Sequence, residues 1–129
     1  MRNMKPPVLT INGYDVERDS TMQYTGDDIM DIVILQTNIV NYLSNNVQPE
    51  AAGNADFYAI IGSMKHIPTD IYLRVLNAAV SGEVYPINIL ANSISSTLKF
   101  CRFHHSALKL TEFISSQTRT AANTRKAGN

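Results

Sequence analysis

The stretch from Leu98 to His105 carries the side chains best suited to chemistry in this chain of 129 residues. Cationic and aromatic residues are interleaved there. Aromatic rings can stack on bases while Lys and Arg contact phosphates, and each stacked base contributes roughly 1–3 kcal/mol. The pattern predicts a binding site for single-stranded RNA or for a partner protein, formed by Lys99, Phe100, Arg102, Phe103, His104, His105 and Lys109.

The same stretch also fits a half-buried strand, in which the two phenylalanines fill the core and the basic residues face solvent. Further along, Arg119, Arg125 and Lys126 follow without any acidic residue after Glu112. A basic arm of this kind would strengthen weak, salt-sensitive binding to nucleic acid. Three charges on a tail can also serve solubility alone.

The triplet Gly26-Asp27-Asp28 has the sequence that holds catalytic metals in viral RNA polymerases. Here its surroundings indicate the start of a helix instead. Thr25 stands three residues before Asp28, as in a capping box, and acidic residues in a first turn complement the helix dipole. We therefore interpret the triplet as a helix cap. A weak magnesium site at Asp27 and Asp31 is the alternative.

Motifs for catalysis and metal binding are absent from the sequence. Cys101 is the one cysteine, whereas structural zinc needs four ligands with paired spacing, so a site built from Cys101, His66, His104 and His105 is not expected. No phosphate-binding loop, dinucleotide fingerprint or nucleophile elbow is present. We expect no catalytic residues, no metal, no cofactor and no enzymatic activity.

The formal net charge is zero, from 11 basic and 11 acidic residues. Residues 1–64 hold eight acidic and three basic side chains, a net of −5, and residues 65–129 hold three acidic and eight basic ones, a net of +5. The halves can attract one another within one fold. Alternatively, they give an asymmetric surface that pairs with another copy or another protein. A wholly basic nucleic-acid binder is excluded.

The first half of the chain contains two clear local signals. Asn12-Gly13 between two short apolar-rich segments predicts a β-hairpin over about 8–17. Apolar residues at helical spacing predict a helix over about 26–44. The run from Phe57 to Ile61 reads as a buried strand before Gly62, although its spacing with Met64 also fits a helix.

In the second half, the pattern predicts a helix over 70–80 that ends at Gly82. A short strand at 84–85 and a helix over 87–98 follow. A further strand is expected over 98–104, then a last helix from Ser106 to about Ser115.

These elements favour a single α/β domain with a small mixed sheet. Its organisation would be an N-terminal arm (1–6), a globular domain (7–115) and a mobile basic tail (116–129). The main competitor is a mostly helical domain that carries one hairpin.

For function, the pattern favours a non-enzymatic interaction or assembly protein that forms a homodimer. Its partners would be itself and other proteins. The alternative is a single-stranded RNA-binding protein that uses residues 98–109 and the tail. Apolar runs such as Ile32 to Leu35 are far too short to span a membrane. With no signal peptide and one cysteine, we expect the cytoplasm or the inside of a virus particle rather than secretion.

Asn, Ser, Thr and Gln together make 36 of the 129 residues, against 22 charged ones. A short, neutral chain rich in these residues resembles the accessory proteins of virus particles, such as the assembly cofactors in the inner capsids of double-stranded RNA bacteriophages. That resemblance implies partners in a capsid shell and a polymerase, and a role in particle assembly and RNA packaging.

Overall fold

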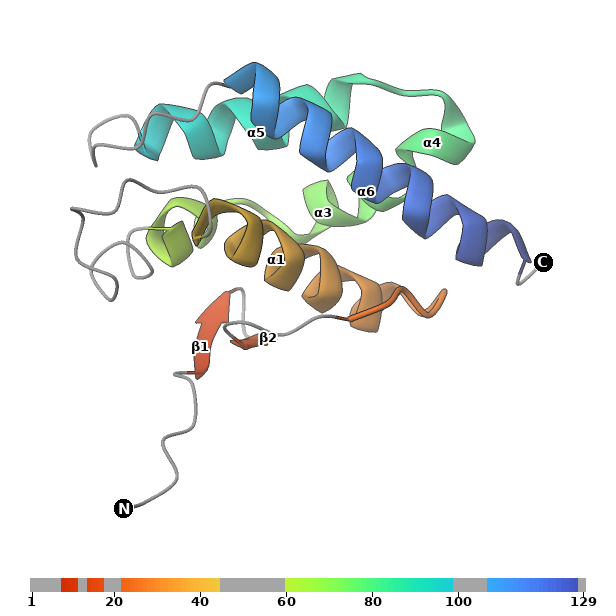
Figure 1. Ribbon diagram of the computed structural model, residues 1–129, viewed down its shortest axis with the longest axis horizontal. Coiled ribbons are helices and arrows are strands. Elements are labelled where there is room, and N and C mark those ends of the chain that lie inside the picture. The colour runs from red at the N-terminus through yellow and green to blue at the C-terminus, as the bar shows by residue number, and fades with distance from the viewer. Residues whose placement is uncertain (1–7, 12–13, 18–21, 45–59, 99–106, 128–129) are drawn as a thin grey trace, which may run out of the picture.

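The chain folds mainly into α-helices (Figure 1). The computed structural model describes residues 8–11, 14–17, 22–44, 60–98 and 107–127. Its elements are β1 (Val8–Ile11), β2 (Tyr14–Glu17), α1 (Asp28–Ser44), α3 (Thr69–Leu76), α4 (Ala78–Ser81), α5 (Tyr85–Leu98) and α6 (Ala107–Ala127). Residues 60–64 are helical as well.

The prediction of an α/β domain with a mixed sheet is wrong, because helices form the body of the molecule. In the described residues, β1 and β2 pair only with each other. The strand expected from Phe57 to Ile61 is contradicted at Ile60 and Ile61, which are helical, and residues 57–59 lie outside the described part. A mostly helical domain with one hairpin, the competing expectation, matches these elements.

The N-terminal hairpin has the predicted position. β1 and β2 are antiparallel, with Val8 opposite Glu17 and Ile11 opposite Tyr14. This register confirms the strand pairing expected from the Asn-Gly dipeptide between them. In Figure 1, the hairpin lies beside α1 on the side away from α6.

α1 is the central helix of the core. Four consecutive side chains, residues 34–37, are each at most 1% exposed, so the helix is covered on all sides there. A helix buried in this way must be apolar around most of its circumference, and the segment from Ile32 to Ser44 contains no charged residue. None of the described helices combines the length and the apolar content needed to cross a membrane.

The helix predicted over 70–80 is divided into two. α3 ends at Leu76, Asn77 caps it with its backbone at φ −94° and ψ 0°, and α4 begins directly afterwards at Ala78. Gly82 has φ 80° and donates its N–H to the Ala78 carbonyl, which confirms the predicted glycine cap.

The strand expected at 84–85 is wrong, because Tyr85 already begins α5. Pro86 fits the first turn of that helix, where the proline's missing N–H costs no intrahelical hydrogen bond.

α6 extends well beyond the predicted end near Ser115. Residues 116–127, expected as a mobile tail, form the second half of this helix. Ala121 is completely buried and Ala122 is 5% exposed. Large apolar residues are absent after Ile114, so the sequence has no strong amphipathic signal there. Alanine is a good helix former, and its small side chain lets neighbouring helices approach closely.

One buried hydroxyl on α1 offers a test of this packing. The Thr37 side chain is 1% exposed, and its Oγ1 has no hydrogen-bond partner among the described residues. Because a buried, unsatisfied hydroxyl costs about 1–3 kcal/mol, Thr37→Val should raise the free energy of unfolding by about 1 kcal/mol. Urea denaturation followed by circular dichroism measures the change.

The matched control is Thr97→Val. Thr97 is exposed on α5 and donates a hydrogen bond to the Ser93 carbonyl, so this substitution should alter stability by less than about 0.5 kcal/mol. A Thr37→Val protein that is less stable than the wild type would contradict the packing of α1.

Candidate functional site

The structure places four of the ten predicted binding residues. Lys99, Phe100, Arg102, Phe103, His104 and His105 lie outside the described residues, so the predicted strand over 98–104 is untested beyond Leu98, the last residue of α5. On α6, Lys109 and Arg119 are exposed and lie about 15 Å apart along the helix axis. Lys126 belongs to the same helix, but its side chain is outside the described part.

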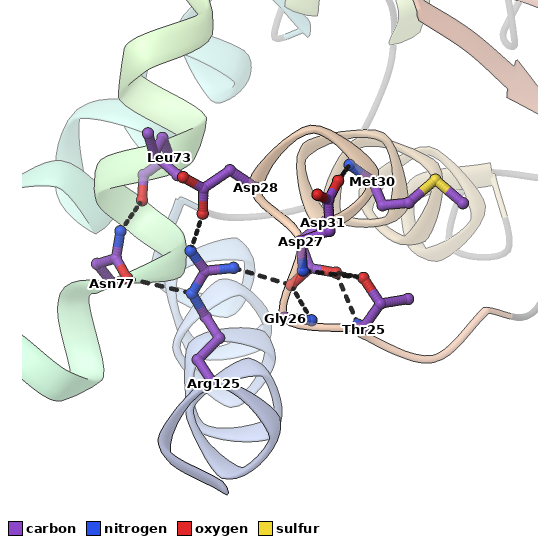
Figure 2. Close-up of polar contacts among 9 residues, drawn as sticks. All are labelled: Thr25, Gly26, Asp27, Asp28, Met30, Asp31, Leu73, Asn77 and Arg125. Atoms are coloured by element: carbon purple, nitrogen blue, oxygen red, sulfur yellow. Dashed lines mark hydrogen bonds and ion pairs between the residues drawn. The ribbon is translucent and has the colours of Figure 1, made fainter. Parts of the chain in front are cut away.

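Arg125, expected on a basic arm, is instead held inside the protein. Its side chain is 12% exposed. Nη1 donates to Asp31 Oδ2 at 2.9 Å, and Nε donates to Asn77 Oδ1 at 3.1 Å. Nη2 forms an ion pair with Asp28 (Figure 2). The guanidinium therefore joins α6 to the start of α1 and to the junction of α3 and α4, whereas the sequence placed it on a basic arm.

Asp31 is the buried partner of this arginine. Its side chain is completely buried, and four donors surround the carboxylate. Oδ1 accepts from the backbone N–H and the hydroxyl of Thr25, at 2.8 and 3.0 Å, while Oδ2 accepts from the Gly26 N–H at 3.0 Å and from Arg125. Both oxygens thus have protein partners, which leaves the alternative of a magnesium site at Asp27 and Asp31 without support. The described residues contain no group of three or more potential metal ligands.

The Gly-Asp-Asp triplet is a helix cap, as interpreted from the sequence, but its residues differ in role. Asp27 precedes α1 and accepts the Met30 N–H at 2.9 Å, which is the bond of an N-cap. The expected pairing of Thr25 with Asp28 is wrong, because Asp28 turns towards Arg125 and the carboxylate that reaches back to Thr25 belongs to Asp31 (Figure 2). Gly26 has φ 93°, a conformation that glycine adopts without strain.

α1 and α6 pack as an antiparallel pair, with the first turn of α1 beside the last turn of α6 (Figure 1). Three contacts follow one another along the pair: Asp31 with Arg125, Asn38 with Gln117, and Tyr42 with Phe113. The middle one is a hydrogen bond of 2.8 Å between the two amides. In the last, the two rings stack with centroids 4.0 Å apart and planes 8° apart.

An open cleft of about 570 Å³ lies between these helices and residues 22–24. α1 contributes Asn38, Asn41 and Tyr42, and α6 contributes a row from Phe113 to Thr124. All the described residues that line the cleft are uncharged, and they combine amide, hydroxyl and aromatic side chains. The volume lies in the range of ligand-binding pockets, so this cleft is the candidate functional site.

Two tyrosines and two amides organise the cleft wall. Tyr24 is 7% exposed and donates its hydroxyl to Gln117 Oε1 at 2.6 Å. Asn38 donates to the same oxygen. Burial raises the pKa of the Tyr24 hydroxyl well above its usual value, and burial together with the Glu112 carboxylate raises the pKa of Tyr42. Both phenols therefore stay neutral around pH 7 and act as hydrogen-bonding groups, not as bases.

Sequence reasoning did not find this cleft. The abundance of Asn, Ser, Thr and Gln was evident, but its location was not. One local signal was present: Asn38, Asn41 and Tyr42 are spaced as i, i+3 and i+4, which places two amides and an aromatic ring on one face of a predicted helix. The facing row on α6 falls largely in the segment that was expected to be a mobile tail.

No protein-family model, curated protein or solved structure matches this chain. The resemblance to virion assembly proteins therefore stays a hypothesis from the composition. The geometry of the described residues is what carries the functional argument.

The Arg125 ion pairs can be tested by substitution. Arg125→Met leaves the buried Asp31 carboxylate without its counter-charge, so the free energy of unfolding should fall by about 3–5 kcal/mol. The Arg125→Met, Asp31→Asn double variant should lose less than the sum of the two single losses, because both single changes break the same interaction. Urea denaturation at constant ionic strength measures all three variants.

Arg119→Met is the matched control on the same helix. Arg119 is exposed, so its removal should change stability by less than about 0.5 kcal/mol. Equal losses for Arg119→Met and Arg125→Met would show that the loss comes from the change in helix α6 itself and not from the ion pair.

Proposed function

We propose that this chain is a non-enzymatic protein that acts by binding another protein in the cleft between α1 and α6. The observation that carries the proposal is the composition of the cleft, in which every described lining residue is uncharged and amide and hydroxyl side chains lie beside aromatic rings. Protein-binding surfaces are depleted of charge and enriched in aromatic residues at their centre. Tyrosine with asparagine and serine is also the composition of antibody combining sites, which bind proteins through rigid rings and adaptable amides.

The titratable groups of the cleft also support binding over catalysis. General acid–base catalysis works best with a group whose pKa lies near the working pH. Tyr24 and Tyr42 are the titratable residues among the described ones that line the cleft, and the pKa of each is raised from a value that is already near 10. Phenols with raised pKa values are poorly suited to move protons near pH 7, whereas the partly exposed Tyr42 can still contact a partner.

The partner can be a second copy of the chain, as the sequence suggested, or a different protein. The Arg125 ion pairs with Asp28 and Asp31 join the basic half of the sequence to the acidic half within one molecule. They support the intramolecular interpretation of the charge segregation. We therefore base the proposed interaction on the neutral cleft and not on attraction between oppositely charged surfaces.

Site-specific photo-cross-linking tests this proposal. A benzoylphenylalanine replaces Thr120, an exposed residue of α6 that lines the cleft, and the full chain is illuminated in cells that naturally express it. The expected result is one dominant protein adduct. An adduct of twice the 14.3 kDa chain mass identifies a homodimer, and another mass identifies a different protein.

The control places the same cross-linker at Asn92, an exposed residue of α5 that does not line the cleft. It should give little of the adduct formed from position 120. Equal adducts from both positions, or no protein adduct from position 120, would contradict the proposal. A nuclease-sensitive adduct would favour the RNA-binding alternative instead.

A further inference from the structure

We infer that the partner in the cleft is an extended peptide segment without charged residues. This inference rests on the proposed function and names the kind of protein surface that the cleft takes. Three features of the described residues support it: a non-helical segment of the chain already packs along α6 as one wall of the cleft, the side chains of α6 form a straight row, and the lining lacks charge.

Residues 22–26 show how a non-helical segment fits against these helices. They contain neither helix nor strand, and hydrogen bonds join them to Asp31 of α1 and to Gln117 of α6. A methyl group built onto Gly26 would be 3.9 Å from Thr124 Cγ2, and the Tyr24 hydroxyl reaches Gln117. Thr124 and Gln117 are about 10 Å apart along α6. The segment therefore runs along the helix as one wall of the cleft and packs one tyrosine against α6, and we infer that a bound peptide would pack beside it in the same way.

The row on α6 has the dimensions of a short extended peptide. Phe113, Gln117, Thr120 and Thr124 recur every three or four residues, so they share one face of the helix. From first to last they span about 16 Å, which equals about five residues of extended chain. Gln23 and Asn123 add exposed amides to the lining. An amide side chain offers a donor and an acceptor, which match the C=O and N–H of a peptide main chain.

The lining of the cleft also determines which side chains a bound peptide can carry. A charged residue that entered the cleft would lose part of its water without gaining a counter-charge from the described lining residues, which is unfavourable. The stacked rings of Tyr42 and Phe113 are only partly buried, so they leave apolar surface for an aromatic or aliphatic side chain. The expected ligand is thus neutral, extended and anchored by at least one apolar residue.

A display library of random 12-residue peptides, panned on the full chain, tests the inference. Enriched peptides should lack charged residues in their common motif and contain an aromatic or aliphatic anchor. Fluorescence polarisation with the labelled peptide then measures binding to variants. Thr120→Arg places a charge and a long side chain in the cleft and should weaken binding at least about tenfold, equivalent to 1.4 kcal/mol. Asn123→Arg, at a second exposed lining residue, should act in the same direction.

Asn92→Arg introduces the same side chain on the exposed face of α5 and should leave peptide binding unchanged. Circular dichroism confirms that all three variants are folded. The inference is overturned if no peptide is enriched, if the common motif is charged, or if Thr120→Arg and Asn92→Arg bind equally well. It is also overturned if labelled neutral oligosaccharides or single-stranded RNA occupy the cleft and peptides do not. If peptides fail while position 120 still gives its protein adduct, the proposed function stands and the partner presents a folded surface instead.

Discussion

The ion pair between Asp31 and Arg125 is the constraint on which the arrangement of this protein depends. It joins residues that are 94 positions apart in the sequence. An isolated buried carboxylate is very costly, so the fold has to bring a counter-charge and further donors to Asp31. The pair with Asp28 adds less, because the Asp28 side chain is 56% exposed and solvent screens it. Burial of Asp31 therefore determines where the end of α6 must lie.

This ion pair changes how the net charge of zero should be interpreted. In the sequence, the acidic residues are concentrated in the first half of the chain and the basic residues in the second half. In the structure, part of that order is used inside the molecule, where Arg125 bridges α6, the first turn of α1 and Asn77 at the junction of α3 and α4. One arginine on an apparent basic tail is thus a structural residue. The exposed Lys109 and Arg119 are widely separated along α6 and form no compact patch by themselves.

Local sequence signals predicted local structure well. The predictions failed where contacts between residues far apart in the sequence determine the structure. The hairpin, α1 and the Gly82 cap each depend on a dipeptide, a spacing or a single glycine, all of which are visible in the sequence. The second half of α6 was missed because small residues such as Ala121 bury little surface and give a weak periodic pattern. Its helix is stabilised by packing and by Arg125. The cleft was missed for the same reason, since one of its walls is that helix.

The cleft and the ion pair both depend on how α6 is held against α1. Arg125 fixes α6 against α1 at one end of the pair, the stacked Tyr42 and Phe113 rings fix it towards the other, and the Asn38–Gln117 bond lies between them. A partner bound in the proposed way would touch both helices, so it would bind only while these contacts hold the two helices together. Binding and packing must then stabilise each other, because a ligand that binds the folded arrangement alone adds its binding free energy to that arrangement. The uncharged lining is consistent with the proposed function: the Arg125 ion pairs hold the helices together at one end, and the uncharged amides and rings beside them are the groups that we propose bind a partner.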